Sequence, residues 1–407
     1  MSDDSRLRPS GPLSGLRVIA FEHAWAAPYG TMMLADLGAD VVKVEPPGVG
    51  DHVRNWTRND LGGLSPHFLS VNRNKRSIVL DLKSDEGRRV ALDLVRRADA
   101  VVSNFKPGTL ESLGLGYGDS SRDNPSLVYC QVSGFGSSGP YAGRRAYDLM
   151  LQAEGGLISV TGTDEENLVK VGAPIVDIMA AMVSAFSIVA AIRDREREGR
   201  GRLIDISMLD VATSVMAFNL FSYGISGELP RPMGTAHPLL APYEVYITRT
   251  GPVAIAVLTE AHWARFCQLI DREDLRDRPE FASAPMRVEN RLQLNEEIDP
   301  VLRRWDQADL VGAMVDAGLA CAQVNDVAGL LAHPQLNYRG FFSTWNIGDH
   351  MVRAPGAPWR ATAHGDQPDR DCLPASTPGV DAESILGDWL GLSAAETKSI
   401  REAGGLG

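Results

Sequence analysis

This sequence has few cysteines, no surplus of basic residues and no apolar stretch at its start. Its four cysteines lie far apart and form no CxxC pair, which argues against a disulfide framework and a zinc knuckle. With 40 Lys and Arg against 52 Asp and Glu, the net charge is −12. Such a surface disfavours broad binding to a nucleic-acid backbone, so we expect no nucleic-acid partner.

Several catalytic signatures are also missing. The eight histidines form no HxxH or HExxH spacing, no GxSxG segment is present, and no cysteine has the setting of a nucleophile. We therefore expect no metal site, and a carboxylate as the nucleophile if there is one. The first residues lack an apolar leader, and the uncharged run 178–192 is shorter than the ~20 residues of a bilayer span. The expected location is the cytoplasm, with no membrane partner.

What is present is an alternation of strand and helix patterns. Apolar strands are predicted at 16–21, 40–45, 77–82, 100–103, 127–132 and 204–207, with helical spacing between several of them. This alternation predicts an α/β fold with a doubly wound, Rossmann-like parallel sheet. The first turn, 22–30, lacks the glycine fingerprint of dinucleotide sites, so NAD binding does not follow.

The sequence pattern changes after the last of these strands. We predict the N-terminal part of a large Rossmann-like domain over 1–201, a linker region with a helix over 202–228, and a smaller α+β domain over 229–330. The smaller domain should begin with a hairpin, 243–248 and 253–258, followed by helices starting near 260, 287 and 307. Residues 331–407 return to short strands and helices and are expected to rejoin the large domain.

Asp177 stands directly before the apolar run 178–192, which charged residues and Gly199 then end. The pattern predicts a buried helix with Asp177 as its N-cap, where free N–H groups and the helix dipole hold a carboxylate ionised. A purely structural cap and a functional anion at the edge of the core both fit this spacing.

Two further patterns could bind phosphate. The segment 134–139 matches GxGxxG after a strand, but Pro140 follows where a helix should begin, so we interpret it as a glycine loop. The segment 72–76 holds three cations, and further cations lie in loops at Lys83, Lys106 and 144–145. They are either solvated surface charges or a site for a phosphate-rich ligand across the strand ends.

Five segments in register resemble the family III CoA-transferases, the formyl-CoA, carnitine and bile-acid type enzymes related to α-methylacyl-CoA racemase. The segments are LADLGADVVKVEPPGVGD, NRNKRSIVLDLKSDEG, SNFKPGTLESLGLGY, SGFGSSGPYAGRRAYDL and VDIMAAM. The resemblance runs from about Leu13 to Asp210 and continues more weakly to the C-terminus. It implies two domains, the larger built from both chain ends, and an interlocked homodimer.

The resemblance also implies a site. Asp177 takes the place of the family's nucleophilic aspartate, and the segments carry over a set of CoA contacts, namely Ala26, Leu80, Lys83, Asn104, Phe105, Lys106, Arg145, Tyr147 and Asp148. The sequence departs from the family pattern at Trp25, Pro46 and Ser112, where formyl-CoA transferases have a glutamine and an arginine at the first two positions and the family has a loop arginine at the third. With CoA or acyl-CoA as substrate, no permanently bound cofactor is expected.

Three functions remain open at this stage. A CoA-transferase would pass CoA from an acyl-CoA to a carboxylic acid, and the similarity of 146–163 to relatives that act on small dicarboxylates favours an acid of that class. A racemase would need a histidine where Tyr147 stands, and a phenol is a poor base at neutral pH, although Glu260 resembles a racemase acid. A non-catalytic acyl-CoA-binding protein is the third. The family's glycine-rich loop falls near 233–237, the candidate lid.

Overall fold

The structure is a computed structural model that describes residues 11–57, 65–359 and 372–407. The chain divides into two compact units. The first comprises the chain up to Leu157, Val171–Phe221 and Gln335–Gly407, and the second comprises Ile158–Lys170 and Ser222–Pro334. Both ends of the chain therefore contribute to the first unit, while the segment 158–170, inside the predicted large domain, groups with the second.

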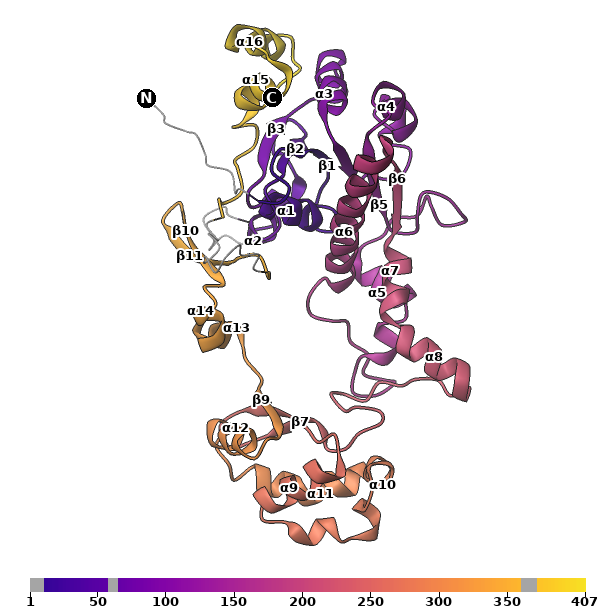
Figure 1. Ribbon diagram of the computed structural model, residues 1–407, viewed down its shortest axis with the longest axis vertical. Coiled ribbons are helices and arrows are strands. Elements are labelled where there is room, and N and C mark those ends of the chain that lie inside the picture. Colours follow the sequence, from indigo (N-terminus) through magenta and orange to yellow (C-terminus); the bar gives the residue numbers. More distant parts are fainter. Residues whose placement is uncertain (1–10, 58–64, 360–371) are drawn as a thin grey trace. The chain divides into compact units, whose positions relative to one another are not determined.

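The first unit is built on a six-stranded sheet in the order β3-β2-β1-β4-β5-β6 (Figure 1). Every neighbouring pair is parallel. The strands are β1 (Arg17–Phe21), β2 (Asp40–Glu45), β3 (Arg76–Val79), β4 (Ala100–Ser103), β5 (Val128–Ser133) and β6 (Leu203–Ser207). The order reverses between β1 and β4, and ligands of doubly wound sheets bind at such a switch point. The predicted Rossmann-like sheet is confirmed.

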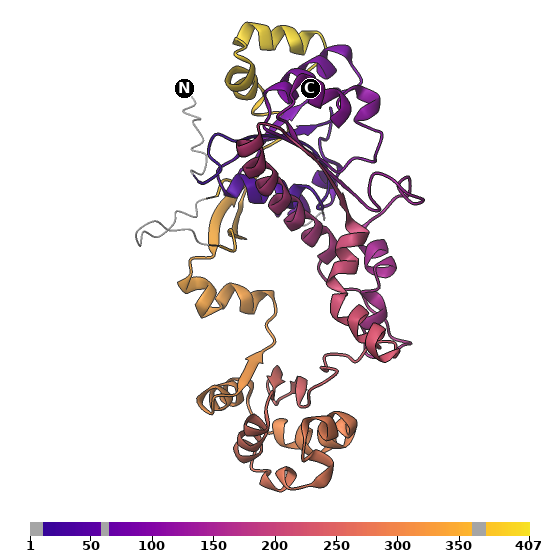
Figure 2. The same ribbon diagram turned by 45° about the vertical axis from the view of Figure 1, so that its right-hand side comes forward.

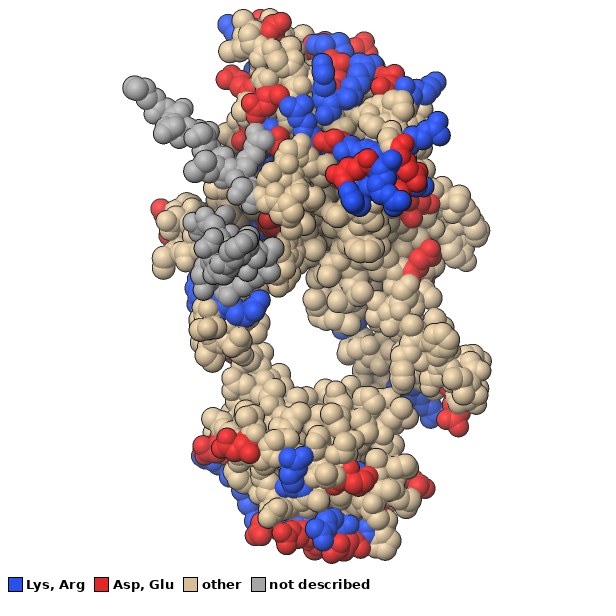
Figure 3. Space-filling model, in the orientation of Figure 1, with Lys and Arg blue, Asp and Glu red and all other residues tan. Residues whose placement is uncertain are grey.

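Helices cover both faces of this sheet, as parallel sheets require. The helices of the N-terminal part are α1 (Pro28–Asp36), α2 (Pro66–Leu69), α3 (Asp85–Arg97), α4 (Tyr117–Asp123) and α5 (Asp148–Glu154). Helix α3 begins as predicted, because the Ser84 hydroxyl accepts the N–H of Gly87 at 3.0 Å and Arg96 and Arg97 end the helix. On its surface arginines lie among aspartates and glutamates (Figure 3).

The C-terminal segment completes the same core. It forms α14 (Pro334–Tyr338), the hairpin β10 (Phe342–Ile347) and β11 (His350–Pro355), and the helices α15 (Ala382–Leu390) and α16 (Ala394–Glu402). Trp389 on α15 donates its indole N–H to Asp40 at 2.8 Å, and Asp381 accepts the N–H of Ser77 at 2.8 Å. These contacts join the end of the chain to β2 and β3.

Helix α6 (Ile175–Glu198) packs beside α1 against the sheet (Figure 2). It has 24 residues, more than the uncharged run suggested, because it starts before Asp177 and continues through the charged tail. The expectation that the longest apolar helix is too short for a bilayer is therefore wrong. By length and composition α6 could cross a membrane, and the core helix of a soluble protein can satisfy the same two criteria. Helices α7 (Met208–Val215) and α8 (Ala217–Ser226) follow it.

The second unit has a three-stranded antiparallel sheet in the order β7-β8-β9. Strands β7 (Tyr243–Ile247) and β8 (Pro252–Ala256) form the predicted hairpin, and β9 (Ala320–Gln323) adds an edge that the sequence pattern did not predict. Around a core that includes Trp263 and Phe281 lie α9 (Glu260–Leu269), α10 (Ala284–Glu289), α11 (Arg291–Leu302) and α12 (Gln307–Asp316), and α13 (Val327–Ala332) follows β9 in the chain.

The three cations of the segment 72–76 are neither solvated nor free for a ligand. Arg73 pairs with Asp36, Arg76 pairs with Asp40, and the Lys75 ammonium lies 2.6 Å from a Glu22 carboxylate oxygen. All three cations have side chains exposed by 11% or less. Both interpretations of these three positions are therefore wrong, because carboxylates from other elements neutralise them inside the first unit.

Candidate active site

Asp177 lies in the first turn of α6 rather than at its cap. The N-cap position is Pro174, and Asp177 is three residues further along. Its carboxyl group is half-buried, and no hydrogen bond to it is present within the described ranges. Burial, reinforced by the negative charge of Asp148, raises the pKa of Asp177 to about 7. The expectation that a helix terminus holds Asp177 firmly ionised is therefore wrong.

Asp148 performs the capping. One of its carboxylate oxygens accepts the N–H of Val176 at 2.9 Å and that of Asp177 at 3.4 Å, and the other accepts a hydrogen bond from Gln152 at 2.6 Å. Asp148 is itself the first residue of α5. Two helices thus meet at their N-termini, and the carboxylate of one satisfies the free amides of the other. The capping carboxylate is also the charge that raises the pKa of Asp177.

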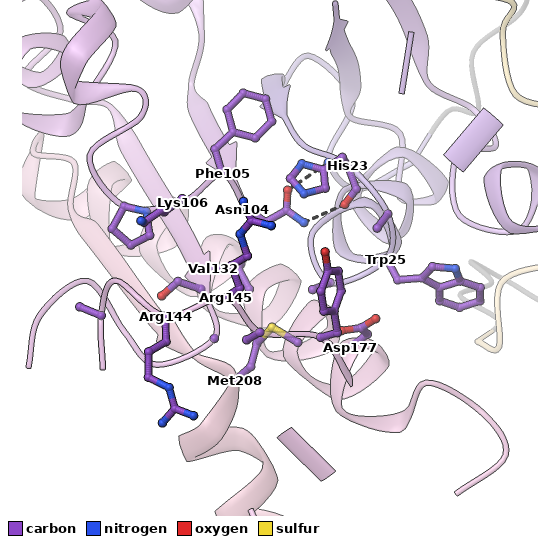
Figure 4. A pocket seen from close by; sticks show the side chains of 18 of the residues that line it. His23, Trp25, Asn104, Phe105, Lys106, Val132, Arg144, Arg145, Asp177 and Met208 are labelled. Carbon is purple, nitrogen blue, oxygen red and sulfur yellow. Dashed lines mark hydrogen bonds between the residues drawn. The ribbon is translucent and has the colours of Figure 1, made fainter. Parts of the chain in front are cut away.

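Asp177 lines a cavity of about 370 Å³ in the first unit. The cavity lies beyond the carboxyl ends of β1, β4 and β5, at the switch point of the sheet (Figure 4). Of the predicted CoA contacts it brings together Ala26, Asn104, Phe105, Lys106, Arg145 and Tyr147. Arg144, one of the loop cations noted in the sequence, also lines it, as do His23, His52 and Met208, which the sequence analysis did not identify as ligand contacts.

The cavity has a cationic side. Lys106 follows β4, and Arg144 and Arg145 lie in the loop after β5. Arg144 is held by Glu154, at 2.6 Å, and stacks on Phe135 and Tyr141. Lys106 and Arg145 are exposed and form no ion pair with any residue that the structure describes. Two unpaired cations at the mouth of a cavity are suited to phosphate.

The loop after β1 forms the opposite side. Asn104 uses both ends of its side-chain amide there: its oxygen accepts the N–H of His23 at 3.0 Å, and its nitrogen donates to the His23 carbonyl at 2.8 Å. The next residue, Ala24, has φ of 58°, a left-handed conformation that few alanines adopt. In this structure Asn104 therefore fixes the loop that carries His23 and Trp25, in addition to lining the cavity.

Two of the predicted contacts, Leu80 and Lys83, lie away from this cavity. Leu80 is buried in the main core, and its backbone forms a bridge with Leu406. Lys83 is exposed in the turn before α3. Of the positions that depart from the family pattern, Trp25 lines the cavity, whereas Pro46 is exposed in a loop and Ser112 is exposed in the 3-10 helix Glu111–Leu113.

The glycine loop 134–139 has a structural explanation. Gly134 lies so close to Ala146 that an added Cβ would stand 2.2 Å from the Ala146 Cβ. Ser137 donates its hydroxyl to Asp205 at 2.6 Å, which pins the loop to β6. The GxGxxG match thus marks close packing of two loop segments, with no helix directly after it.

Glu260 and the loop 233–237 belong to the second unit. Both carboxylate oxygens of Glu260 are bound by the Arg287 guanidinium, at 2.9 and 3.0 Å, and these hydrogen bonds lower the pKa of Glu260. A carboxylate held in this way is a weak base. In the loop, Gly234 donates to the Gly162 carbonyl at 2.7 Å and the His237 carbonyl accepts from Arg291 at 2.6 Å. Its role as a lid stays a prediction.

Within residues 11–57, 65–359 and 372–407, no cluster of three or more His, Cys, Asp or Glu side chains has the geometry to hold a metal ion. The cavity thus combines the poorly solvated carboxyl group of Asp177, two exposed cations, and the imidazole and indole rings of His23, His52 and Trp25.

Comparison with known proteins gives a consistent result. The family model described as CoA-transferase family III matches residues 13–377. A succinate–glutarate CoA-transferase from Agrobacterium fabrum is 37% identical over 346 residues, covering 84% of this chain and 86% of the relative. A succinyl-CoA:mesaconate CoA-transferase from Haloarcula hispanica is 36% identical over 362 residues, 86% and 90% of the two chains. The crystal structure of a CAIB/BAIF family protein from Brucella suis superposes with a TM-score of 0.84 at 33% identity, covering 93% of this chain and all of that one.

Proposed function

This chain belongs to CoA-transferase family III, and from that premise we propose that it moves CoA from an acyl-CoA to a small dicarboxylic acid through a covalent intermediate on Asp177. The observation that carries the proposal is the position of Asp177, a poorly solvated carboxyl group that shares one cavity with two unpaired cations. Relatives named for succinate, glutarate and mesaconate support the class of acid.

The ionised Asp177 would attack the thioester carbonyl of the donor. The C–S bond breaks, a mixed anhydride forms between Asp177 and the acyl group, and CoA leaves as its thiolate. The thiolate then attacks the Asp177 carbonyl of the anhydride, which releases the donor acid and leaves an aspartyl-CoA thioester. The acceptor carboxylate repeats the two steps in reverse: it displaces CoA thiolate to give a new anhydride, and the thiolate takes the new acyl group and frees Asp177.

The half-buried setting of Asp177 suits this chemistry. A carboxylate that gives up little hydration on reaching the thioester is a better nucleophile than a solvated one. Around it, Lys106 and Arg145 would bind the CoA phosphates, and the rings of His23 and Trp25 would border the acyl group.

Transfer assays test this proposal. With succinyl-CoA as donor and a panel of mono- and dicarboxylic acids as acceptors, the protein should form a new acyl-CoA with a dicarboxylate, and Asp177→Asn should reduce the rate by at least about 10³-fold, as expected for loss of a nucleophile. Transfer that survives the substitution would rule out Asp177. The absence of transfer to every acid, with acyl-CoA still bound, would favour the non-catalytic alternative.

The racemase alternative is not favoured, since Tyr147 is 61% exposed and Glu260 is bound by Arg287.

The predicted homodimer has a candidate contact surface on α6. Four apolar side chains of α6 at helical spacing, Met182, Val183, Phe186 and Val189, are between 36% and 75% exposed. In Figure 3 the surface over the middle of this helix is uncharged, whereas Arg, Asp and Glu gather at its C-terminal end. A second copy of the chain would cover these side chains.

A further inference from the structure

Two imidazole rings, His23 and His52, line the same cavity as Asp177. Their ring centroids are 5.2 Å apart. We propose that the His23–His52 pair binds the second, non-reacting carboxylate of a dicarboxylic acid whose first carboxylate is joined to Asp177. The inference rests on the proposed function and assigns the residues that would distinguish a dicarboxylate from a monocarboxylate.

The strand order separates this pair from the cationic side. His23 follows β1 and His52 lies in the segment after β2, whereas Lys106 follows β4 and Arg145 follows β5. In the sheet order β2-β1-β4-β5 the two histidines and the two cations therefore come from opposite sides of the switch point. Figure 4 shows Lys106 and Arg144 on one side of the view, and His23, Trp25 and Asp177 on the other. If CoA phosphates bind the cations, the acyl group extends toward the histidines.

His52 is positioned to bind an anion. Its side chain is 52% exposed, and its Nδ1 lies 3.5 Å from a carboxylate oxygen of the fully buried Asp51. Burial alone would raise the pKa of Asp51, but the Lys43 ammonium 2.9 Å away outweighs it and lowers that pKa, so Asp51 is an anion. With Asp51 on the Nδ1 edge, Nε2 is the nitrogen left for a ligand. With both ring nitrogens protonated, such a ring has one N–H for each of two carboxylates.

His23 supplies the second donor. The amide of Asn104 holds its backbone on both sides, and the ring stands 5.6 Å from that of Phe105. Burial lowers the pKa of His23, which keeps this ring neutral with one N–H to donate. Each of the two rings can donate one N–H to a different oxygen of a single carboxylate.

A buried lysine sets the spacing of the two rings. Each histidine directly follows an acid in the chain, Glu22 before His23 and Asp51 before His52. The Lys43 ammonium lies 2.9 Å from Asp51 and 3.6 Å from Glu22, and it donates to the Glu22 carbonyl at 3.1 Å. The side chains of these three residues are 2% exposed or less. Buried ion pairs of this kind hold a fixed geometry, because separating them would leave charges unpaired.

The test compares acceptors that differ only in the second carboxylate. With succinyl-CoA as donor, kcat/KM is measured for glutarate and for pentanoate in the wild type, His52→Phe, His52→Gln and the control His350→Phe, which changes an exposed histidine of β11. In a ping-pong reaction this ratio for the acceptor reports the second half-reaction alone. We expect His52→Phe to lower it about 10- to 100-fold for glutarate and less than about twofold for pentanoate, since a charge-assisted hydrogen bond is lost only with glutarate. His52→Gln, which keeps one N–H, should fall between, and the control should match the wild type.

The same variants distinguish a failure of this inference from a failure of the proposed CoA-transferase function. Trapping of the Asp177 intermediate with hydroxylamine should succeed in His52→Phe as in the wild type. If trapping succeeds and the two acceptors are affected equally, or neither is, the histidine pair does not bind the second carboxylate. A wild type that prefers pentanoate contradicts the inference as well. If trapping fails in the wild type, the proposed function itself is wrong.

Discussion

Near neutral pH the Asp177 carboxyl group is ionised and protonated in comparable amounts, because burial and the neighbouring Asp148 raise its pKa to about 7. Only the ionised form can attack a thioester. The rate of CoA release from an acyl-CoA in a single turnover should therefore rise with pH through about 7 and fall about tenfold per pH unit well below it. A rate that is flat between pH 5 and 8 would contradict this.

The charge of Asp148 can be removed while its capping oxygen is kept. In Asp148→Asn, the side-chain oxygen can still accept the N–H of Val176, at the expense of the hydrogen bond from Gln152. Because the negative charge near Asp177 is gone, the acid limb of the single-turnover profile should move to lower pH, by up to about one unit. Loss of rate with an unmoved limb would mean that Asp148 acts only as a structural cap.

Asp177 should also reduce stability above neutral pH. In the unfolded chain its pKa is near 4 and in the folded chain about 7, so the folded state disfavours the ionised form and stability is lost as the pH rises between these values. We expect Asp177→Asn to raise the free energy of unfolding by roughly 2 kcal/mol at pH 8, less than the full shift implies because the group is partly solvated, and by little at pH 4. Urea denaturation at the two pH values measures it; equal effects at both would count against the raised pKa.

At the scale of elements, strands and helices with strong periodicity could be predicted from the sequence. The apolar strands β1 to β6 and the amphipathic α3 follow from local patterns. Strand β9 could not be predicted in this way, because its residues ACAQ do not alternate between apolar and polar and its partner β8 lies far away in the sequence. The cap of α6 was wrongly assigned for the same reason: Asp148 reaches it from another helix, and no spacing rule within α6 reveals that.

In the candidate site, too, local patterns could be read from the sequence and contacts between distant segments could not. The cations Lys106 and Arg145 could be identified because they follow strand ends and match family motifs, and they do line the cavity. Arg73, Lys75 and Arg76 looked similar in the sequence, yet tertiary carboxylates neutralise them. His23 lies just after β1, so a search for polar residues directly after buried strands would have found it, whereas His52 begins a 3-10 helix well after β2 and would have been missed.

Helix α9 permits a test of the racemase alternative. In Glu260→Gln the buried guanidinium of Arg287 keeps its bonds to the carbonyls of Ala241 and Phe281 but loses its counter-charge, which should cost about 1–3 kcal/mol of stability. Transfer by the folded protein should stay within about twofold of the wild type. Neither protein should exchange the α-proton of a 2-methylacyl-CoA for deuterium in D₂O; exchange that Glu260→Gln abolishes would restore the racemase reading.

At the scale of the whole molecule, the exposed apolar face of α6 predicts self-association. Phe186 is 75% exposed, and Phe221 and Ile225 on α8 are 73% and 87% exposed. Light scattering should show a dimer, and Phe186→Glu should shift the mass toward that of a monomer, because a buried charge without a partner opposes association. Met351→Glu, at an equally exposed site on β11, is the control and should leave the dimer intact. A wild type that stays monomeric at micromolar concentration would contradict the prediction.

The whole account depends on a covalent bond between Asp177 and its substrate. The most direct measurement is mass spectrometry of the peptide that contains Asp177 after the protein has been treated with hydroxylamine, with and without succinyl-CoA. We predict that Asp177 becomes a hydroxamate only when the acyl-CoA is present, because only the anhydride and the aspartyl-CoA thioester react with hydroxylamine. An unmodified Asp177 in a protein that still transfers CoA would contradict the account.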